Sequence, residues 1–180
     1  MRVIAGIARG IPLVAPRGGD TRPITDRVKE TLFAILAERV PDAVALDLYA
    51  GTGAIGIEAL SRGATHVTFV ERGRPAVAAL RANLERTRLA DEATVHAMSV
   101  ERFCERPVER PWSLVFLDPP YAERAIVAPL QALVPNLAPG AVIAVKHHWR
   151  ATPPGVEDLE TVRQRRFGET MLTFMQARDR

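Results

Sequence analysis

An aspartate and a tyrosine flank two consecutive prolines in the segment Asp118-Pro119-Pro120-Tyr121. The mostly apolar run before it, Trp112 to Leu117, predicts a buried parallel strand, and ligands of open α/β sheets bind at the carboxyl ends of strands. Two prolines restrict φ and remove two backbone donors, so this turn is stiff. It presents a carboxylate and carbonyl oxygens, which accept hydrogens from an NH₂ group, and a ring that stacks on a flat molecule. We therefore predict that Asp118, Pro119, Pro120 and Tyr121 hold a flat acceptor bearing an amino group.

A glycine-rich segment, residues 51–56, follows a second apolar run, Val44 to Tyr49. Its glycines match the G-x-G-x-x-G pattern of dinucleotide sites. Asp47, however, lies within the run, where its carboxylate would repel a pyrophosphate bound at the helix N-terminus. It suits a cationic ligand such as S-adenosylmethionine, which carries a sulfonium and an ammonium group and no phosphate. Glu71, at the end of the next predicted strand, is placed to accept hydrogen bonds from ribose hydroxyls.

These motifs occur in an order typical of one enzyme class. D-x-x-x-G-x-G after the first strand, an acid after the second and D-P-P-Y after the fourth resemble the Rossmann-like amino-methyltransferases. The segments 22–33 (R-P-I-T-D-R-V-K-E-T-L-F) and 47–63 look like one branch, the RsmD family, whose members methylate guanine N2 of bacterial 16S ribosomal RNA. The opening residues 2–6 and the closing residues 166–170 are similar as well, so the resemblance covers nearly the whole chain.

The resemblance implies a cofactor, a partner and a set of site residues. The cofactor would be S-adenosylmethionine, and the partner would be 16S ribosomal RNA, within a 30S subunit or an assembly intermediate. We expect a monomer in the cytoplasm, with neither a metal nor a membrane as partner. The cofactor-binding residues implied by the family pattern are Asp47, Tyr49, Gly51, Thr52, Gly53, Glu71, Met98 and Ser99.

The chain departs from the family pattern at two strand ends. After the third predicted strand, residues 93–97, the superfamily often places an aspartate on the adenine amino group, whereas this chain has Met98 and Ser99. Ser99 can still form a hydrogen bond, and Met98 can pack on the purine. After the fifth strand, residues 141–145, a glutamate is common, but this chain has Lys146-His147-His148, and the resemblance assigns no role to these residues.

The alternation of helical and strand patterns predicts an α/β fold with a mainly parallel sheet. We expect a Rossmann-like class I methyltransferase fold with seven strands, the last one antiparallel, and a short N-terminal β-hairpin. Residues 1–22 would form a basic arm appended beside the active-site rim, and residues 23–180 the methyltransferase domain of one compact unit. Helices are predicted at about 25–40, 54–62, 75–89, 99–106 and 123–135, and a closing strand pair at about 159–166 and 170–176.

Composition limits the function classes further. A single cysteine, Cys104, excludes an internal disulfide and a multi-cysteine zinc site. The net charge is only +3, yet 22 of the 24 basic residues are arginine, a side chain suited to bidentate phosphate binding. Residues 1–22 contain four arginines and one aspartate, whereas Arg163, Arg165 and Arg166 form a second cluster that solvent contact alone can explain. RNA contact is therefore predicted at Arg9, Arg17, Arg22 and Arg27.

Other functions stay open at this stage. An amino-methyltransferase acting on DNA adenine N6 or on another RNA would share the D-P-P-Y turn, although the chain has no spare region for target recognition. A dinucleotide-binding oxidoreductase would keep the glycine segment. A non-catalytic RNA-binding module would explain the basic arm but not the three acidic positions together.

Overall fold

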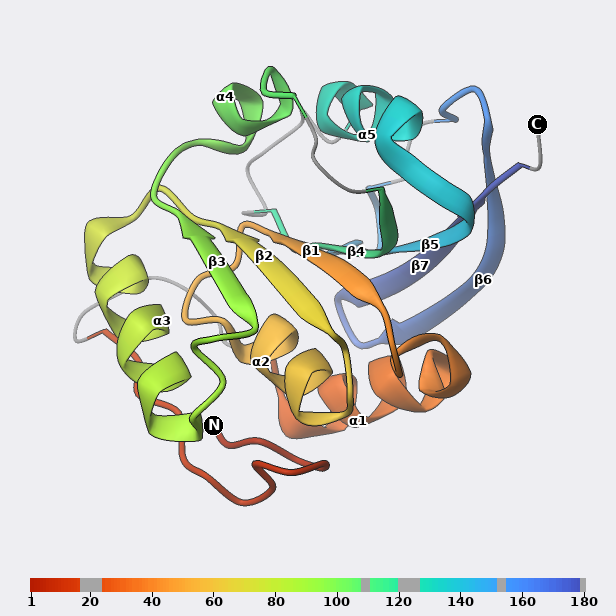
Figure 1. The fold of residues 1–180 in the computed structure, drawn as a ribbon. Helices are drawn as coiled ribbons and strands as arrows, with labels where there is room; N and C mark the ends of the chain where they lie inside the picture. Colours follow the sequence, from red (N-terminus) through yellow and green to blue (C-terminus); the bar gives the residue numbers. More distant parts are fainter. Residues whose placement is uncertain (17–23, 108–110, 120–126, 152–154, 179–180) are drawn as a thin grey trace.

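A computed structural model describes the chain except for residues 17–23, 108–110, 120–126, 152–154 and 179–180. Seven strands form one sheet in the order β3-β2-β1-β4-β5-β7-β6 (Figure 1). The strands are β1 Val44–Leu48, β2 His66–Val70, β3 Ala93–His96, β4 Trp112–Leu117, β5 Leu137–His148, β6 Leu159–Phe167 and β7 Thr170–Ala177. The helices are α1 Asp26–Ile35, α2 Ala54–Ser61, α3 Arg74–Thr87, α4 Val100–Cys104 and α5 Val127–Leu133, with 3₁₀ turns at Ala37–Arg39 and Val134–Asn136.

The direction of the strands confirms the predicted α/β sheet. Strands β1 to β5 run parallel to one another, and β7 is antiparallel to β5. The closing hairpin does not simply add an antiparallel edge, because β7 lies between β5 and β6 and the edge strand is β6. Since β6 is antiparallel to β7, it runs in the same direction as β5. Its last residue, Phe167, therefore lies at the carboxyl edge of the parallel strands.

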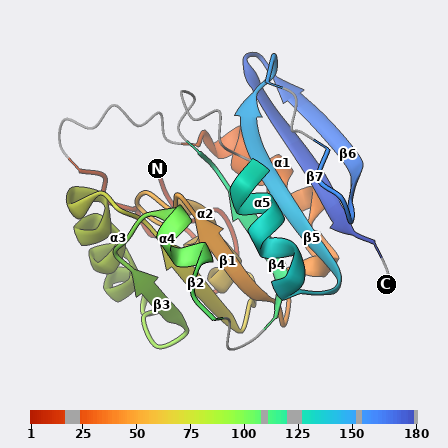
Figure 2. The same cartoon turned by 90° about the horizontal axis from the view of Figure 1, so that it is seen from above.

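Helices cover both faces of this sheet (Figures 1 and 2). Alternate residues of a strand point to opposite faces, so each central strand contributes to two cores. Phe116 of β4 faces the layer of α1, α2 and α3, where its ring centroid lies 5.8 Å from that of Phe33. Val115 and Leu117 face the layer of α4 and α5 and pack in one cluster with Leu130.

The boundaries of two elements differ from the sequence prediction. Thr25 caps α1, since its hydroxyl accepts a hydrogen bond from the Val28 amide at 3.4 Å. The helix nevertheless ends at Ile35, because the backbone of Leu36 (φ −90, ψ 4) leaves helical geometry and the chain continues as a 3₁₀ turn. Strand β5 begins at Leu137, before the predicted start at residue 141, because a register shift in β4 lets Leu137 pair with Trp112.

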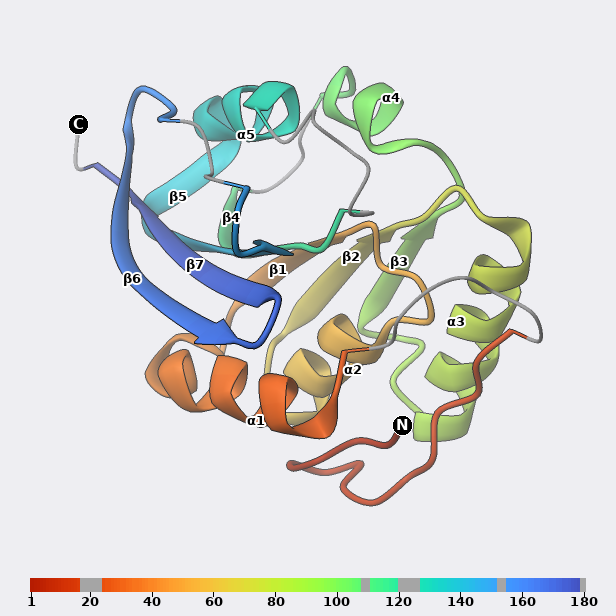
Figure 3. The same ribbon diagram turned by 180° about the vertical axis from the view of Figure 1, so that it is seen from behind.

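The N-terminal segment, residues 1–16, is not an appendage. Its predicted hairpin consists of a single antiparallel bridge between Arg2 and Pro12. Figure 3 shows the segment passing beneath α1 and α2 and then running beside α3. Val3, Ala8 and Leu13 are buried in the core on that side of the sheet. The predicted division between arm and domain, at residue 22, falls outside the described residues.

A buried ion pair fastens the N-terminal segment to the fold. Lys29 on α1 and Glu58 on α2 lie 3.0 Å apart, and both side chains are fully buried. Lys29 also donates to the carbonyl of Arg2 at 2.6 Å. The Glu58 carboxylate accepts the backbone amides of Ile4 at 2.8 Å and Ala5 at 2.9 Å. Two helices and the first residues of the chain thus share one polar network inside the core.

Candidate active site

Charged side chains from four adjacent strands gather at the carboxyl edge of the sheet. Asp47 lies on β1, Glu71 follows β2, Asp118 follows β4 and Lys146 lies near the end of β5. The three carboxylates are close enough that Asp118 and Glu71 both act electrostatically on Asp47. The structure therefore brings together the three acids chosen from the sequence, and it adds a lysine to which the sequence assigned no role.

The glycine segment turns from β1 into the start of α2. Gly51 and Gly53 both have a positive φ, +55 and +80, which strains other residues. A Cβ on Gly53 would overlap the Leu80 side chain, whereas a Cβ on Gly51 would meet no heavy atom within 4 Å. The main chain at Gly51 is thus open to the close approach of a ligand. Thr52 is half-buried, and its carbonyl accepts a hydrogen bond from the Asn83 amide at 3.0 Å.

Glu71 holds the glycine segment in place. One carboxylate oxygen accepts the Gly51 amide at 2.9 Å and the other accepts the Gly73 amide at 2.6 Å. A carboxylate has about four acceptor sites, so both oxygens can still accept a ligand hydroxyl. Glu71 therefore links the loop after β1 to the turn after β2 and keeps acceptor capacity for a ligand.

Asp47 lies beneath the loop, not on its surface. Its side chain is only 1% exposed, and its Oδ2 accepts the Gly56 amide at 2.9 Å. Burial raises the pKa of Asp47 to about 8; the Gly56 hydrogen bond opposes this shift, and the charges of Asp118 and Glu71 add to it. Asp47 thus bonds to the backbone near the start of α2. It can affect a ligand either by positioning the glycine segment or through the electrostatic field of its own charge.

Asp118 forms an ion pair with the lysine that the sequence left without a role. Lys146 Nζ lies 2.7 Å from Oδ1 and 2.8 Å from Oδ2 of Asp118, so it bridges both oxygens. The Asp118 side chain is 24% exposed and that of Lys146 is 11% exposed. Burial raises the pKa of Asp118, and the Lys146 charge and hydrogen bond oppose that rise. Pro119 is buried, whereas Pro120 and Tyr121 lie outside the described residues.

A second group of predicted cofactor residues lies at the start of α4. The Ser99 hydroxyl caps this helix by accepting the Arg102 amide at 3.4 Å. The pKa of Glu101 is lowered by its own backbone amide, by the Ser99 hydroxyl and, further, by the hydroxyl of Tyr49. Met98 packs against the core of the α4 and α5 layer. Tyr49 and Ser99 thus both lie near Glu101, a proximity that no motif in the sequence indicates.

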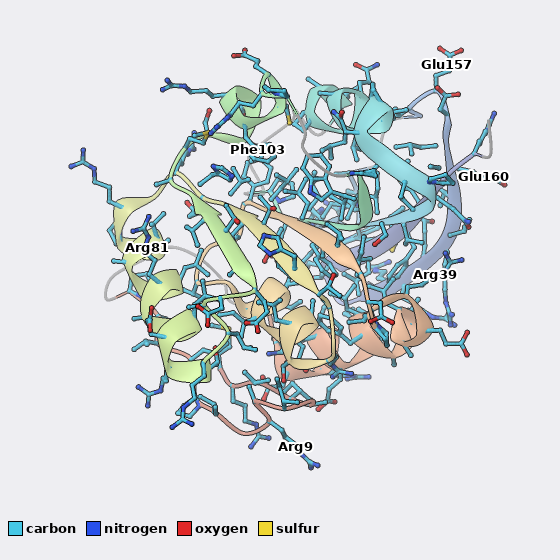
Figure 4. All side chains as sticks on the ribbon, in the orientation of Figure 1. Arg9, Arg39, Arg81, Phe103, Glu157 and Glu160 are labelled. Atoms are coloured by element: carbon cyan, nitrogen blue, oxygen red, sulfur yellow. The ribbon has the colours of Figure 1, made fainter. Side chains whose placement is uncertain are left out.

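The predicted RNA-binding arginines are not brought together. Arg9 is exposed at the bottom of the view in Figure 4. The neighbouring Ile7 amide bonds to the Ser61 carbonyl, at the end of α2 opposite the glycine segment. Arg9 therefore lies away from the carboxyl edge. Arg27 is exposed in the first turn of α1, and Arg17 and Arg22 lie outside the described residues.

The described part of the chain contains neither a metal-binding cluster nor a helix able to span a membrane. There, no cluster of three or more His, Cys, Asp and Glu side chains has the arrangement needed to hold a metal ion. Among the same residues, none of the helices combines the length and the apolar character that crossing a bilayer requires.

Comparison with known proteins places these features in a family. The family described as Conserved hypothetical protein 95 matches residues 1–176. The Bacillus subtilis protein YlbH is 36% identical over 184 residues, which cover 99% of this chain and 100% of that protein. Ribosomal RNA small subunit methyltransferase D of Escherichia coli is 36% identical over 148 residues, which cover 81% of this chain and 74% of that enzyme.

A solved structure agrees with the sequence comparison. The Escherichia coli protein yhhF superimposes with a TM-score of 0.90 at 35% identity, covering 100% of this chain and 99% of its own. The sheet, the glycine segment and the acidic edge thus occur in a chain with close relatives of known fold and named activity. This protein is a methyltransferase and belongs to the Conserved hypothetical protein 95 family, the RsmD family.

Proposed function

We propose that this enzyme transfers the methyl group of S-adenosylmethionine to the exocyclic N2 of a guanine in 16S ribosomal RNA. The observation that carries the proposal is the half-buried Asp118 carboxylate at the end of β4, beside an acidic edge and an open glycine segment. The names of curated relatives, which are small-subunit ribosomal RNA methyltransferases, support the substrate class.

The residues present fit S-adenosylmethionine. Glu71, together with Asp47 once a cation favours its ionised form, favours a ligand with positive charges over one with phosphates, whereas the charge of Asp118 is paired with Lys146. Gly51 leaves its main chain accessible, and Glu71 keeps acceptor sites for ribose hydroxyls. When bound, S-adenosylmethionine supplies an electrophilic methyl carbon on a sulfonium. We propose that Tyr49, Met98 and Ser99 line the adenosine side of this site, because they lie around the start of α4 next to it.

We propose that Asp118 and the Pro119 carbonyl orient the acceptor nitrogen. The N2 lone pair of guanine is delocalised into the ring, so hydrogen bonds from the NH₂ group to these oxygens would favour a tetrahedral nitrogen. Its lone pair would then form the new N–C bond as the C–S bond breaks and its electrons pass to sulfur. The nitrogen becomes acidic at that point and gives its proton to Asp118 or to water. Most of the rate gain would come from positioning and electrostatics.

Lys146 occupies one acceptor position on each Asp118 oxygen and leaves others free. Its charge favours the ionised carboxylate, which accepts hydrogen bonds but donates none. We propose that this ion pair keeps Asp118 ionised and in the rotamer that faces the base. The base would have to leave its stack to reach the site, and Tyr121 would then stack on it.

The substrate is the point to test first. Purified protein is incubated with labelled S-adenosylmethionine and, separately, with 16S ribosomal RNA, 30S particles and duplex DNA, and the labelled base is mapped. We expect N2-methylguanine in 16S RNA or 30S particles. Label in N6-methyladenine of DNA would overturn the proposal. Asp118→Ala should abolish transfer with cofactor affinity kept within a few fold, whereas Asp91→Ala, an exposed carboxylate after α3, should not.

A further inference from the structure

The second arginine cluster lies at the same edge of the sheet as Asp118. Strand β5 ends at His148, which pairs with Thr170, and Thr170 pairs with Phe167 at the end of β6. The next residue along β5, Trp149, donates its backbone amide to the Glu169 carbonyl at 2.9 Å. Figure 2 shows the turn between β6 and β7 beside the end of β5. Trp149 lies three positions beyond Lys146, which corresponds to about 10 Å of strand.

Trp149 holds two guanidinium groups at this edge. The guanidinium carbon of Arg166 lies 3.8 Å from the centroid of the Trp149 ring, and that of Arg150 lies 5.0 Å from it. Arg166 also donates through Nε to the Gly168 carbonyl at 2.8 Å. In the described residues, neither arginine forms an ion pair with a carboxylate. Both guanidinium groups are therefore held in position before any ligand binds, and both arginines are exposed to solvent.

Acidic residues gather around the start of β6, and basic residues gather toward its end, at the carboxyl edge of the sheet. Residues 157–160 include three acids, Glu157, Asp158 and Glu160, whereas residues 163–166 include three arginines. Figure 4 shows Glu157 and Glu160 together at the far end of the hairpin. The arginines occupy the half of the strand that reaches the carboxyl edge. A strand that merely needed solvation would not require this separation of signs.

The strand pairing shows to which face of the sheet Arg166 points. Arg166 pairs with Met171, which pairs with His147, so these side chains share a face of the sheet. Lys146 points to the opposite face, the one covered by α1 and α2. The Arg166 face is the one covered by α5, the helix that follows the D-P-P-Y turn in the chain. Arg166 and Lys146 thus share the carboxyl edge of the sheet but lie on opposite faces, so an RNA strand that reaches both Arg166 and Asp118 has to cross that edge.

We propose that Trp149, Arg150 and Arg166 form a docking site for the phosphate backbone of the RNA strand that carries the target nucleotide. Guanidinium groups bind phosphate bidentately, and their stacking on Trp149 lowers the entropy lost on binding. Arg163 and Arg165 are exposed on the same half of β6 but point to the opposite face of the sheet, because Arg165 pairs with Leu172 and Leu172 pairs with Lys146. This inference rests on the proposed RNA substrate and assigns the contact to the β5–β7 edge instead of the N-terminal segment.

The test compares two double variants with equal charge loss. Arg150→Gln/Arg166→Gln removes the docking charges, and Arg81→Gln/Arg86→Gln removes two exposed charges from α3. Binding of a 16S RNA fragment is measured by fluorescence anisotropy against salt, without methyl donor. Two lost phosphate contacts should shallow the log–log salt slope by about 1.4 to 1.8 in the first variant only. Its KM for RNA should rise at least tenfold with cofactor affinity unchanged.

A third variant separates the contribution of the Trp149 ring from that of the two arginine charges. Trp149→Leu keeps both guanidiniums but removes the ring, so RNA affinity should fall while the salt slope stays near that of the parent protein. An unchanged slope in Arg150→Gln/Arg166→Gln, or a change equal to that of the α3 control, overturns the docking site. A loss confined to 30S particles, with naked RNA bound as before, also overturns it and indicates a ribosomal protein contact. Failure of the parent protein to methylate any RNA contradicts the proposed function instead, because the binding slopes need no turnover.

Discussion

Lys146 bridges both carboxylate oxygens of Asp118, at 2.7 and 2.8 Å, across the carboxyl ends of β5 and β4. The family pattern favours a glutamate after the fifth strand, so this chain places a cation where an anion is usual. Burial alone would raise the pKa of Asp118 and favour its neutral form, whereas the lysine favours the charged form. The ion pair therefore sets the protonation state of the residue on which the proposed reaction depends.

Lys146→Met should make methyl transfer more sensitive to acid. Without the cation the pKa of Asp118 rises, so the carboxyl is protonated over more of the neutral range. The rate should fall as the pH is lowered and recover at higher pH, by about tenfold for each pH unit below the new pKa. Single-turnover rates between pH 6 and 9 measure the shift, and Lys146→Arg, which keeps the charge, serves as control. Identical pH profiles for Lys146→Met and the parent would remove the lysine from this role.

Glu71→Ala should weaken cofactor binding through the glycine segment. The variant removes both acceptors of the Gly51 and Gly73 amides and also the group proposed to bind ribose. A charge-assisted hydrogen bond contributes about 1.5–3 kcal/mol, which corresponds to a loss of roughly 10- to 150-fold in affinity. Calorimetry with S-adenosylmethionine measures this loss. Glu85→Ala, an exposed acid on α3, should leave the affinity unchanged, and equal affinities in both variants would contradict the placement of the cofactor.

Asp47 should link cofactor binding to pH. Its pKa of about 8 means that the free enzyme holds a proton there at pH 7, and a cationic ligand favours the charged form. Binding of S-adenosylmethionine should therefore release a proton, and affinity should rise with pH up to about 8. Calorimetry at pH 7 in two buffers of different ionisation enthalpy counts the proton. Asp47→Asn should abolish the release, and adenosine, which carries no cation, should show none with the parent.

The raised pKa of Asp47 also makes the free energy of unfolding depend on pH. The folded state holds the Asp47 proton up to about pH 8, whereas the unfolded state loses it near 3.8. Within that window the native state binds more protons, so this group destabilises the unliganded fold as pH rises. Asp47→Asn should flatten that dependence in urea unfolding curves measured between pH 5 and 8. An equally steep decline in the variant would assign the dependence to other groups.

The sequence predicted the sheet and its acidic edge because those features depend on local pattern. Apolar runs predict parallel strands, and the carboxyl ends of such strands meet at one edge, which places Asp47, Glu71 and Asp118 together without further information. The partner of Asp118 could not be predicted in this way. Lys146 lies on a different strand, β5, and its pairing depends on the side-chain direction that the register of β4 and β5 imposes.

The N-terminal segment was mistaken for an appendage for a related reason. Its alternation is weak and its charge is high, features that favour a solvated arm. The contacts that bury it are long-range: Ile4 and Ala5 donate to Glu58 on α2, and Val14 donates to Asn83 on α3. A lysine in a helix also looks like a surface residue, yet Lys29 is fully buried. The pairing of two charges distant in sequence leaves no local signature.

Lys29→Met should destabilise the fold without touching the active edge. The change leaves the buried Glu58 with only Arg62, 2.8 Å from its Oε1 and partly exposed, as a cation, and it removes the donor to the Arg2 carbonyl. Breaking a buried ion pair costs about 3–5 kcal/mol. The double variant Lys29→Met/Glu58→Gln should be less destabilised than the sum of its parts, because neither fully buried charge of the pair is left without the other. Urea unfolding of both single variants and the double variant gives the coupling free energy, and additive losses would mean that the pair contributes nothing as a pair.

Deleting residues 1–14 should also destabilise the fold, because it removes part of the Lys29–Glu58 network. The deletion removes the Ile4 and Ala5 amides from Glu58, the Arg2 carbonyl from Lys29, and the buried side chains of Val3, Ala8 and Leu13. We therefore expect a large loss of unfolding free energy, and any loss of methyl transfer would follow from it. Arg9→Gln, in which one exposed charge is removed, should keep stability within about 0.5 kcal/mol. A truncated protein that unfolds at the same urea concentration as the full chain would show that the segment is an appendage after all.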